Sequence, residues 1–226
     1  IEQNCYILNE RFSGGPSEYQ VGEDSIRFFT NMNSSIYNQC REWIGSDKIK
    51  AITIMSPFYD DKAQLIKSLC DEYKPKSVRL IVQEGFGALP KARNIPDSVK
   101  IYRWDKIVSE SQKKYQDFFH AKCFFFEGER HNYMLCGSAN ASVAAFGIDS
   151  VSPSNQEACV GYKSSTRNYF EQTGFKLVAP IKKHEIPQTD NSESTKDKNK
   201  PISVWIKEAS YLYNNYELSI DNTAGT

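Results

Sequence analysis

Residues 120–140 of the chain are HAKCFFFEGERHNYMLCGSAN. Two apolar runs, at 117–126 and 133–136, flank a short polar tip at 128–131 that contains one glycine. Apolar runs on either side of a short glycine-bearing turn are typical of a β-hairpin. The stretch therefore predicts two antiparallel strands joined by a tight turn.

On both sides of this hairpin, strand-like segments alternate with helix-like ones. Apolar or β-branched runs predict strands at 49–55, 78–82, 99–102 and 156–162. Apolar residues at helical spacing predict one helix capped by Asn33 or Ser34 and ended by Gly45, and another that begins near Asp60. The small residues of 141–146 predict a further helix start. This alternation favours an α/β fold, with a mixed β-sheet of about seven strands flanked by helices on both faces.

Composition along the chain predicts four parts. Residues 182–200 contain a long polar and charged run, which is typical of a linker or mobile loop. The predicted parts are N-terminal strands and loops at 1–30, the α/β domain at 31–181, the linker at 182–200 and the start of a C-terminal β extension at 201–226.

The whole composition excludes several classes of protein. Of the 226 residues, 39% are hydrophobic and 13% aromatic, enough to fill a core. Twenty-eight basic residues balance 28 acidic ones, which excludes a histone-like polycation. No apolar run reaches the roughly 18 residues of a membrane span, so we expect a soluble protein. The six cysteines form no CxxC pair, and we expect buried free thiols in a reducing, cytoplasmic location. Because the first residue is Ile1, we expect a piece of a longer protein.

The chemistry of the hairpin centres on His120 and Lys122. The two side chains project from one face of a strand, since side chains alternate with a period of two. Burying either group alone is costly, but an anion between them would explain both: lysine neutralises it and imidazole attacks it or carries its proton. Ser138 and Asn140 add a hydroxyl and an amide, as a phosphate pocket requires. Glu157 is placed to fix the histidine tautomer through the far ring nitrogen.

With these residues the sequence resembles the phospholipase D superfamily. The family motif is histidine, any residue, lysine, four residues, aspartate, about six residues and then glycine-serine-any-asparagine. Here Glu127 stands in place of the aspartate, and nine residues rather than six separate it from Gly137. The surplus falls at the hairpin tip, where insertions are tolerated. In that family the aspartate is generally structural rather than chemical, so we expect activity to survive the Glu127 exchange. The alternative is a degenerate half that only supports its partner.

The resemblance implies a phospholipase D-like half-domain that hydrolyses phosphodiesters without metal or cofactor. In such enzymes one histidine attacks phosphorus to form a phosphohistidine, and a second motif supplies the histidine that protonates the leaving oxygen. His120 would be nucleophile or general acid, Lys122 and Asn140 would bind the phosphate, Ser138 would orient it and Glu157 would align the histidine. This chain holds one motif, so we expect the second half from a homodimer partner or from the remainder of a longer chain.

Local charge favours nucleic acid as the substrate. Between residues 74 and 115 ten basic residues face four acidic ones, an excess that suits DNA or RNA. We expect Lys113, Lys114 and Arg103 to contact the substrate, although a solvated helix face explains the excess equally well. The alternatives are a phospholipase or phosphatidyltransferase, and a nucleic-acid-binding module without catalysis.

Overall fold

A computed structural model describes residues 18–83, 88–107, 120–182, 185–186, 204–212 and 217–224. The chain divides into two compact units, Ile1–Gln188 and Thr189–Thr226. The second unit contains an antiparallel pair of strands, β9 (Val204–Leu212) and β10 (Glu217–Ala224), with a register shift between Asp221 and Asn222.

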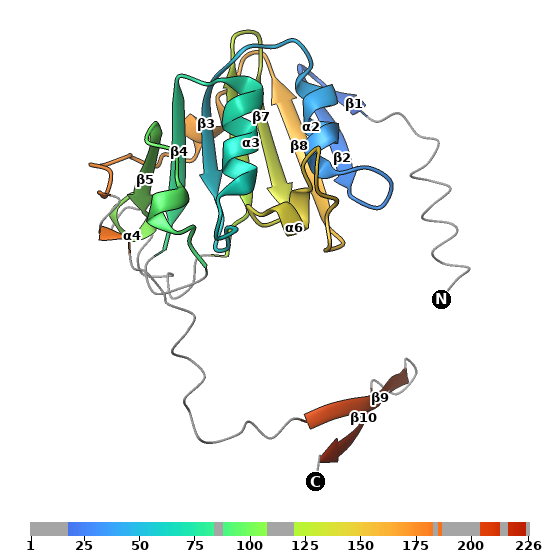
Figure 1. Cartoon of the computed structure of the whole chain (residues 1–226). Helices are drawn as coiled ribbons and strands as arrows, with labels where there is room; N and C mark the ends of the chain where they lie inside the picture. Colours follow the sequence, from blue (N-terminus) through green and yellow to red (C-terminus); the bar gives the residue numbers. More distant parts are fainter. Residues whose placement is uncertain are drawn as a thin grey trace. The chain divides into compact units, whose positions relative to one another are not determined.

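The first unit is built on one eight-stranded mixed sheet (Figure 1). Its order is β1-β2-β8-β7-β6-β3-β4-β5. The pairs β3–β4 and β4–β5 are parallel, and all the other neighbours are antiparallel. The strands are β1 (Glu18–Val21), β2 (Asp24–Thr30), β3 (Ile49–Met55), β4 (Ser77–Val82), β5 (Val99–Arg103), β6 (Cys123–Gly128), β7 (Asn132–Gly137) and β8 (Ala158–Ser164).

Short helices accompany this sheet. Those described are α2 (Ile36–Ile44), α3 (Gln64–Tyr73), the 3-10 helix η1 (Ala92–Asn94), α4 (Trp104–Ile107), α6 (Val143–Phe146) and α7 (Tyr169–Gln172). Helix α3 is the crossover between the parallel strands β3 and β4. The α/β class with a mixed sheet is therefore confirmed.

The helix boundaries follow from local capping. The Oγ of Ser35 accepts the N–H of Asn38 at 3.1 Å, so the cap of α2 is Ser35 rather than Asn33 or Ser34. At the start of α3, the carboxylate of Asp60 accepts the N–H of Gln64 at 2.5 Å, as the sequence suggested. A serine thus caps α2, whereas the N-cap of α3 is Ala63 and Asp60 accepts N–H groups of its first turn.

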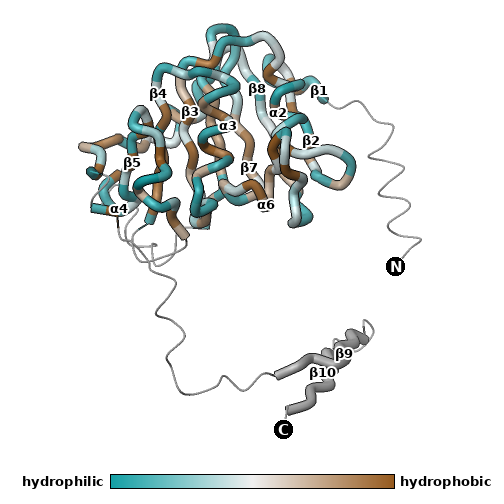
Figure 2. The backbone as a smooth tube through the Cα atoms, in the orientation of Figure 1, coloured by the Kyte–Doolittle hydropathy of each residue, from teal (hydrophilic) through white to brown (hydrophobic). Residues whose placement is uncertain are grey.

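The three consecutive phenylalanines of β6 show why both faces of the sheet are covered. Phe124 and Phe126 belong to a cluster with residues of α2, α3 and α6, whereas Phe125 packs on the opposite face beside Tyr169 and Phe170 of α7. Because side chains alternate along a strand, a fully apolar strand needs partners on both sides. Figure 2 shows hydrophobic residues concentrated along the central strands.

Strands β1 and β2 join the main sheet. All seven residues of β2 pair with β8, from Asp24 opposite Ser164 to Thr30 opposite Ala158. Residues 18–30 are therefore part of the α/β unit, which differs from the separate N-terminal part expected from the sequence. The other predicted boundaries, at 181–182 and 200–201, stay predictions.

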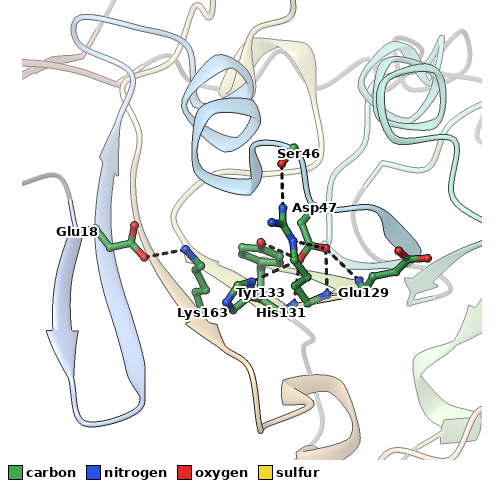
Figure 3. Close-up of polar contacts among 8 residues, drawn as sticks. Glu18, Ser46, Asp47, Glu129, His131, Tyr133 and Lys163 are labelled. Atoms are coloured by element: carbon green, nitrogen blue, oxygen red, sulfur yellow. Dashed lines mark hydrogen bonds and ion pairs between the residues drawn. The ribbon is translucent and has the colours of Figure 1, made fainter.

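The tip of the β6–β7 hairpin is held by one buried carboxylate. Asp47, 1% exposed, accepts the backbone N–H groups of Glu129, Arg130 and His131 at 3.2, 3.0 and 2.9 Å (Figure 3). Burial opposes ionisation of Asp47, but these donors outweigh it and lower the pKa of the carboxyl. The tip is thus fixed to the loop before β3, and the predicted hairpin forms with His131 at its turn.

Candidate active site

Three strand ends bring the predicted residues together at one edge of the sheet. His120 and Lys122 come just before β6, Gly137 ends β7 and Glu157 comes just before β8. Since β6, β7 and β8 are antiparallel neighbours, the start of β6, the end of β7 and the start of β8 lie at the same edge. The backbone N–H of Gly137 donates to the carbonyl of Lys122 at 3.3 Å and continues the β6–β7 ladder into the site.

The side chains of His120 and Lys122 are in direct contact. The Nζ of Lys122 lies 3.1 Å from Nε2 and 3.3 Å from Nδ1 of His120, and it donates to the His120 carbonyl at 3.2 Å. His120 itself is exposed. The ammonium group therefore sits against an imidazole that faces solvent, the arrangement expected of a cation and a nucleophile that share one anion.

Lys122 is a buried charge, 9% exposed. Burial lowers the pKa of its ammonium group, and the negative charge of Glu157 offsets part of that effect. A buried cation whose compensating carboxylate bonds elsewhere keeps attraction for a further anion. This makes Lys122 suited to a phosphate oxygen.

Ser138 and Glu157 form the second contact of the site. The hydroxyl of Ser138 donates to Oε2 of Glu157 in a short hydrogen bond, and it accepts the backbone N–H of Ala158 at 3.0 Å. The other oxygen of Glu157 accepts from the side chain of Asn155 at 3.3 Å. Glu157 thus holds the serine, whereas alignment of His120 by Glu157 stays a prediction.

Gly137 is required by close packing rather than by its backbone angles. A Cβ at this position would lie 2.3 Å from the carbonyl oxygen of Ala158 and 2.6 Å from the Cα of Cys159. Both atoms belong to the backbone of β8, which cannot move without breaking its ladder. Absence of a side chain at 137 therefore lets Ser138 approach the start of β8.

Asn140 carries an unpaired polar atom. Its Oδ1 is buried without a hydrogen-bond partner among the described residues. An unsatisfied buried amide in a native fold calls for an explanation, and a ligand is one of the usual ones. Oδ1 is an acceptor, whereas a phosphate oxygen would need a donor, so this atom does not test the predicted role of Asn140, which stays a prediction.

The loop after β3 is fastened to the Asn140 turn. The backbone N–H of Ala141 donates to the hydroxyl of Ser56 at 3.0 Å and to the carbonyl of Phe58 at 3.1 Å. The backbone of this loop therefore lies beside the turn that carries Asn140. Phe58, in the same loop, is 40% exposed.

Asn31 is a site residue that the sequence did not suggest. Its Oδ1 accepts the backbone N–H of Glu157 at 2.9 Å, and its Nδ2 donates to the carbonyls of Asn155 and Ala145 at 2.7 and 3.0 Å. Asn31 therefore positions the segment that carries Glu157. It lies at the end of β2, far from the motif in sequence, so no local pattern marks it.

Glu127 lies at the other end of β6, five residues beyond Lys122. It forms an ion pair with Arg79 of β4, and the Arg79 guanidinium lies 5.2 Å from the ring centre of Phe170. A span of five strand residues corresponds to roughly 16 Å. Among the described residues, the ion pair of Glu127 joins β6 to β4 and α7 rather than to His120.

The expected substrate-contacting residues are only partly described. Arg103 ends β5 at the same edge as His120, three strands from β6 or roughly 14 Å. Its guanidinium pairs with Asp105 at 3.0 and 3.1 Å. Lys113 and Lys114 lie outside the described residues, so their placement stays a prediction.

The described residues contain no metal cluster and no membrane-spanning helix. Among them, no three His, Cys, Asp or Glu side chains gather as a metal site would require. None of their helices is long and apolar enough to cross a bilayer.

Comparison with solved structures finds several similar chains. NucT from Helicobacter pylori is 15% identical over 67% of this chain and 92% of NucT, with a TM-score of 0.41. Nuc from Salmonella typhimurium, described as a phospholipase D family member, is 13% identical over 70% of this chain and 99% of Nuc, with a TM-score of 0.40.

Yeast tyrosyl-DNA phosphodiesterase is a longer similar chain. It is 13% identical over 60% of this chain, with a TM-score of 0.38, and the match spans only 31% of the yeast protein. No protein-family model matches the sequence, and a search of curated proteins found no match. The chemistry of the site is therefore argued from its own residues.

Proposed function

We propose that the chain is a metal-independent phosphodiesterase of the phospholipase D type that acts on nucleic acid. The observation that carries this proposal is the contact between Lys122 and His120 at 3.1 Å, beside the Ser138–Glu157 pair on one sheet edge. A cation, a nitrogen nucleophile and a hydroxyl at one place are the groups that phosphoryl transfer needs without a bound metal.

In the proposed reaction each group has one task. The imidazole of His120 attacks phosphorus and the bond to the leaving oxygen breaks, which gives a phosphohistidine. Lys122 and the amide of Asn140 hold the non-bridging oxygens, and Ser138, fixed by Glu157, orients them. A histidine from a second half-site protonates the leaving oxygen, and water then attacks phosphorus to release His120.

The second half-site is part of the proposal. The sequence holds one HxK motif followed by Gly-Ser-Ala-Asn, and the other two histidines, His131 and His184, have no such context. His131 lies at the hairpin tip, where its ring nitrogen is 3.6 Å from Asp47. A partner copy of this chain, or the remainder of a longer chain, would supply the second histidine.

The activity is tested with bis(p-nitrophenyl) phosphate and a single-stranded oligonucleotide in the presence of EDTA. We expect hydrolysis of both, abolished in His120→Ala and retained in His131→Ala, which removes a histidine outside the site. Mass spectrometry after rapid acid-free quenching should find phosphate on the peptide that contains His120. Cleavage that needs added magnesium, or equal rates in wild type and His120→Ala, would contradict the proposal.

The substrate class is tested by binding. A salt titration with single-stranded oligonucleotides should give a steep log–log slope, and Lys113→Ala with Lys114→Ala should flatten it by about 0.7 per lost phosphate contact. The measurement needs the full-length chain or the dimer. Oligonucleotide binding without any cleavage would favour the binding module, and cleavage of phosphatidylcholine vesicles without oligonucleotide binding would favour the lipid enzyme.

A further inference from the structure

Cys123 of β6 and Cys136 of β7 lie directly opposite each other, one residue away from the site. The register pairs Cys123 with Cys136, and the next step of the same register pairs Lys122 with Gly137. Both cysteines are free thiols of intermediate exposure. Two thiols therefore face each other across the ladder, on the opposite side of the sheet from the buried Phe124.

The hydrogen bonds of the ladder show which kind of pair this is. Gly137 N–H donates to the carbonyl of Lys122 at one end, and Gly128 N–H donates to the carbonyl of His131 at the other. Hydrogen-bonded and non-hydrogen-bonded pairs alternate along an antiparallel ladder. These two bonds show that Lys122 and Gly128, and so the even-numbered positions of β6, belong to hydrogen-bonded pairs. Cys123 is odd-numbered, so Cys123 and Cys136 form a non-hydrogen-bonded pair.

This class of pair has the geometry of a disulfide. Residues in a non-hydrogen-bonded pair have Cα atoms about 4.5 Å apart, with their side chains closer than elsewhere in the ladder. Disulfides span Cα separations of about 4.4–6.8 Å. We infer that Cys123 and Cys136 are a dithiol site that closes to a disulfide by exchange with a small-molecule disulfide such as oxidised glutathione.

The chemistry of closure follows from the contact between the two sulfurs. A hydrogen bond from the Cys123 thiol lowers the pKa of Cys136 and raises that of Cys123, so Cys136 is the attacking thiolate. Its sulfur bonds to one sulfur of the glutathione disulfide and releases a glutathione thiolate. Cys123 then gives up its proton to water, attacks the sulfur of Cys136 and releases the second glutathione. The two protein thiols are oxidised and the small disulfide is reduced.

Closure would act on the neighbouring site residues. Lys122 and Gly137 flank the two cysteines in sequence and are hydrogen-bonded to each other. A covalent link at 123–136 ties the two strands that present the lysine and the glycine–serine turn. The site is thus coupled to the thiol redox state through the ladder itself.

The test is a peptide map of the full chain after incubation with oxidised glutathione and alkylation of the remaining thiols. We expect a mass loss of two hydrogens and a linked pair of tryptic peptides, 123–130 with 131–163. The second peptide also contains Cys159, so Cys159→Ser is the matched control and should keep the link. The Cys136→Ser and Cys136→Ala variants should lose it.

Two results would overturn the inference. One is that Cys123 and Cys136 are both alkylated in the wild type after the glutathione incubation. This measurement does not depend on the folding of any variant. The other is that the 123–130 peptide is linked in Cys136→Ser as strongly as in wild type, through Cys159 or Cys5. Reduction of the linked wild type with dithiothreitol should restore both alkylated peptides.

Discussion

The hydroxyl of Tyr133 donates to Oδ2 of Asp47 at 3.1 Å, although the two residues are 86 positions apart in the sequence. The ring of Tyr133 is 2% exposed and packs edge-on against Trp43. Asp47 therefore joins three turn amides to a core aromatic (Figure 3). The geometry of the hairpin that carries the site depends on this one carboxylate.

Asp47→Ala should destabilise the fold strongly. It leaves three backbone N–H groups and one buried hydroxyl without their acceptor, and each loss costs about 1–3 kcal/mol. We expect a free energy of unfolding lower by at least about 3 kcal/mol in urea denaturation. Asp149→Ala is the matched control, because Asp149 is an exposed partner of Arg41 and should cost less than about 1 kcal/mol. Equal effects of the two substitutions would contradict the role of Asp47.

The same carboxylate should make stability depend on pH. The pKa of Asp47 is lower in the native state than in the unfolded chain, so its contribution is complete above the ordinary value of about 4. It is lost as the pH falls below that value toward the depressed native pKa. We expect the stability gap between wild type and Asp47→Asn to shrink between about pH 6 and about pH 3. A gap that stays constant would show that Asp47 acts through shape alone.

Lys122 should set the alkaline limit of the proposed activity. Because burial lowers the pKa of Lys122, the phosphate-binding cation is lost at a pH below the ordinary lysine value of about 10.4. A pH–rate profile on bis(p-nitrophenyl) phosphate should show this descending limb. Lys122→Arg should turn over more slowly but move the limb to higher pH, since a guanidinium stays charged. An unchanged limb in Lys122→Arg would assign it to another group.

Gly137→Ala should damage both stability and turnover. Its Cβ would meet the backbone of β8 at 2.3 Å, so the strand or the Ser138 turn must shift. We expect a loss of about 2 kcal/mol, similar to other overpacked sites, together with a lower kcat. Gly22→Asn is the control, because Gly22 has a φ of +63° with no atom within 4 Å of its Cβ position, and asparagine tolerates that conformation. Thermal unfolding and oligonucleotide cleavage report the two effects separately.

Phe58→Ala should weaken binding of oligonucleotides but not of small diesters. Phe58 is exposed and its carbonyl is bonded to the Asn140 turn, and stacking of one base on an aromatic ring contributes about 1–3 kcal/mol. We expect at least a roughly fivefold higher Kd for a single-stranded oligonucleotide and an unchanged KM for bis(p-nitrophenyl) phosphate. Tyr19→Ala, which removes another exposed aromatic ring, should leave both values as in wild type. A parallel loss on both substrates would instead show that Phe58 supports the loop.

Local patterns predicted much of the fold. The hairpin, strand β3 and both long helices follow from apolar spacing and nearby caps, which act within a few residues. The placement of β1 and β2 was not predictable in this way. Strand β2 pairs with β8, about 130 residues later, and nothing in the sequence of β2 indicates which strand it pairs with. The predicted strand at 156–162 begins two residues later, at Ala158, which leaves Glu157 in the loop.

The sequence pointed to residues that the fold places close together, but not to the contacts they make. His120, Lys122 and Ser138 are marked by spacing along two paired strands, and the register brings them to one edge. Sequence spacing does not indicate which side chain of the neighbouring strand hydrogen-bonds to Glu157. In the structure this side chain is Ser138. Asn31 stayed hidden for the same reason, since its contacts depend on tertiary packing alone.

The bond between Asn31 and Glu157 joins residues 126 positions apart, and it has a consequence for synthesis of the chain. Every other group of the site is translated before Glu157. On the ribosome, His120, Lys122 and Ser138 therefore emerge before Glu157. The hydrogen bond between Ser138 and Glu157 can form only after β8 has left the exit tunnel. A nascent chain stalled before residue 157 would contain His120, Lys122 and Ser138 without the contact between Ser138 and Glu157.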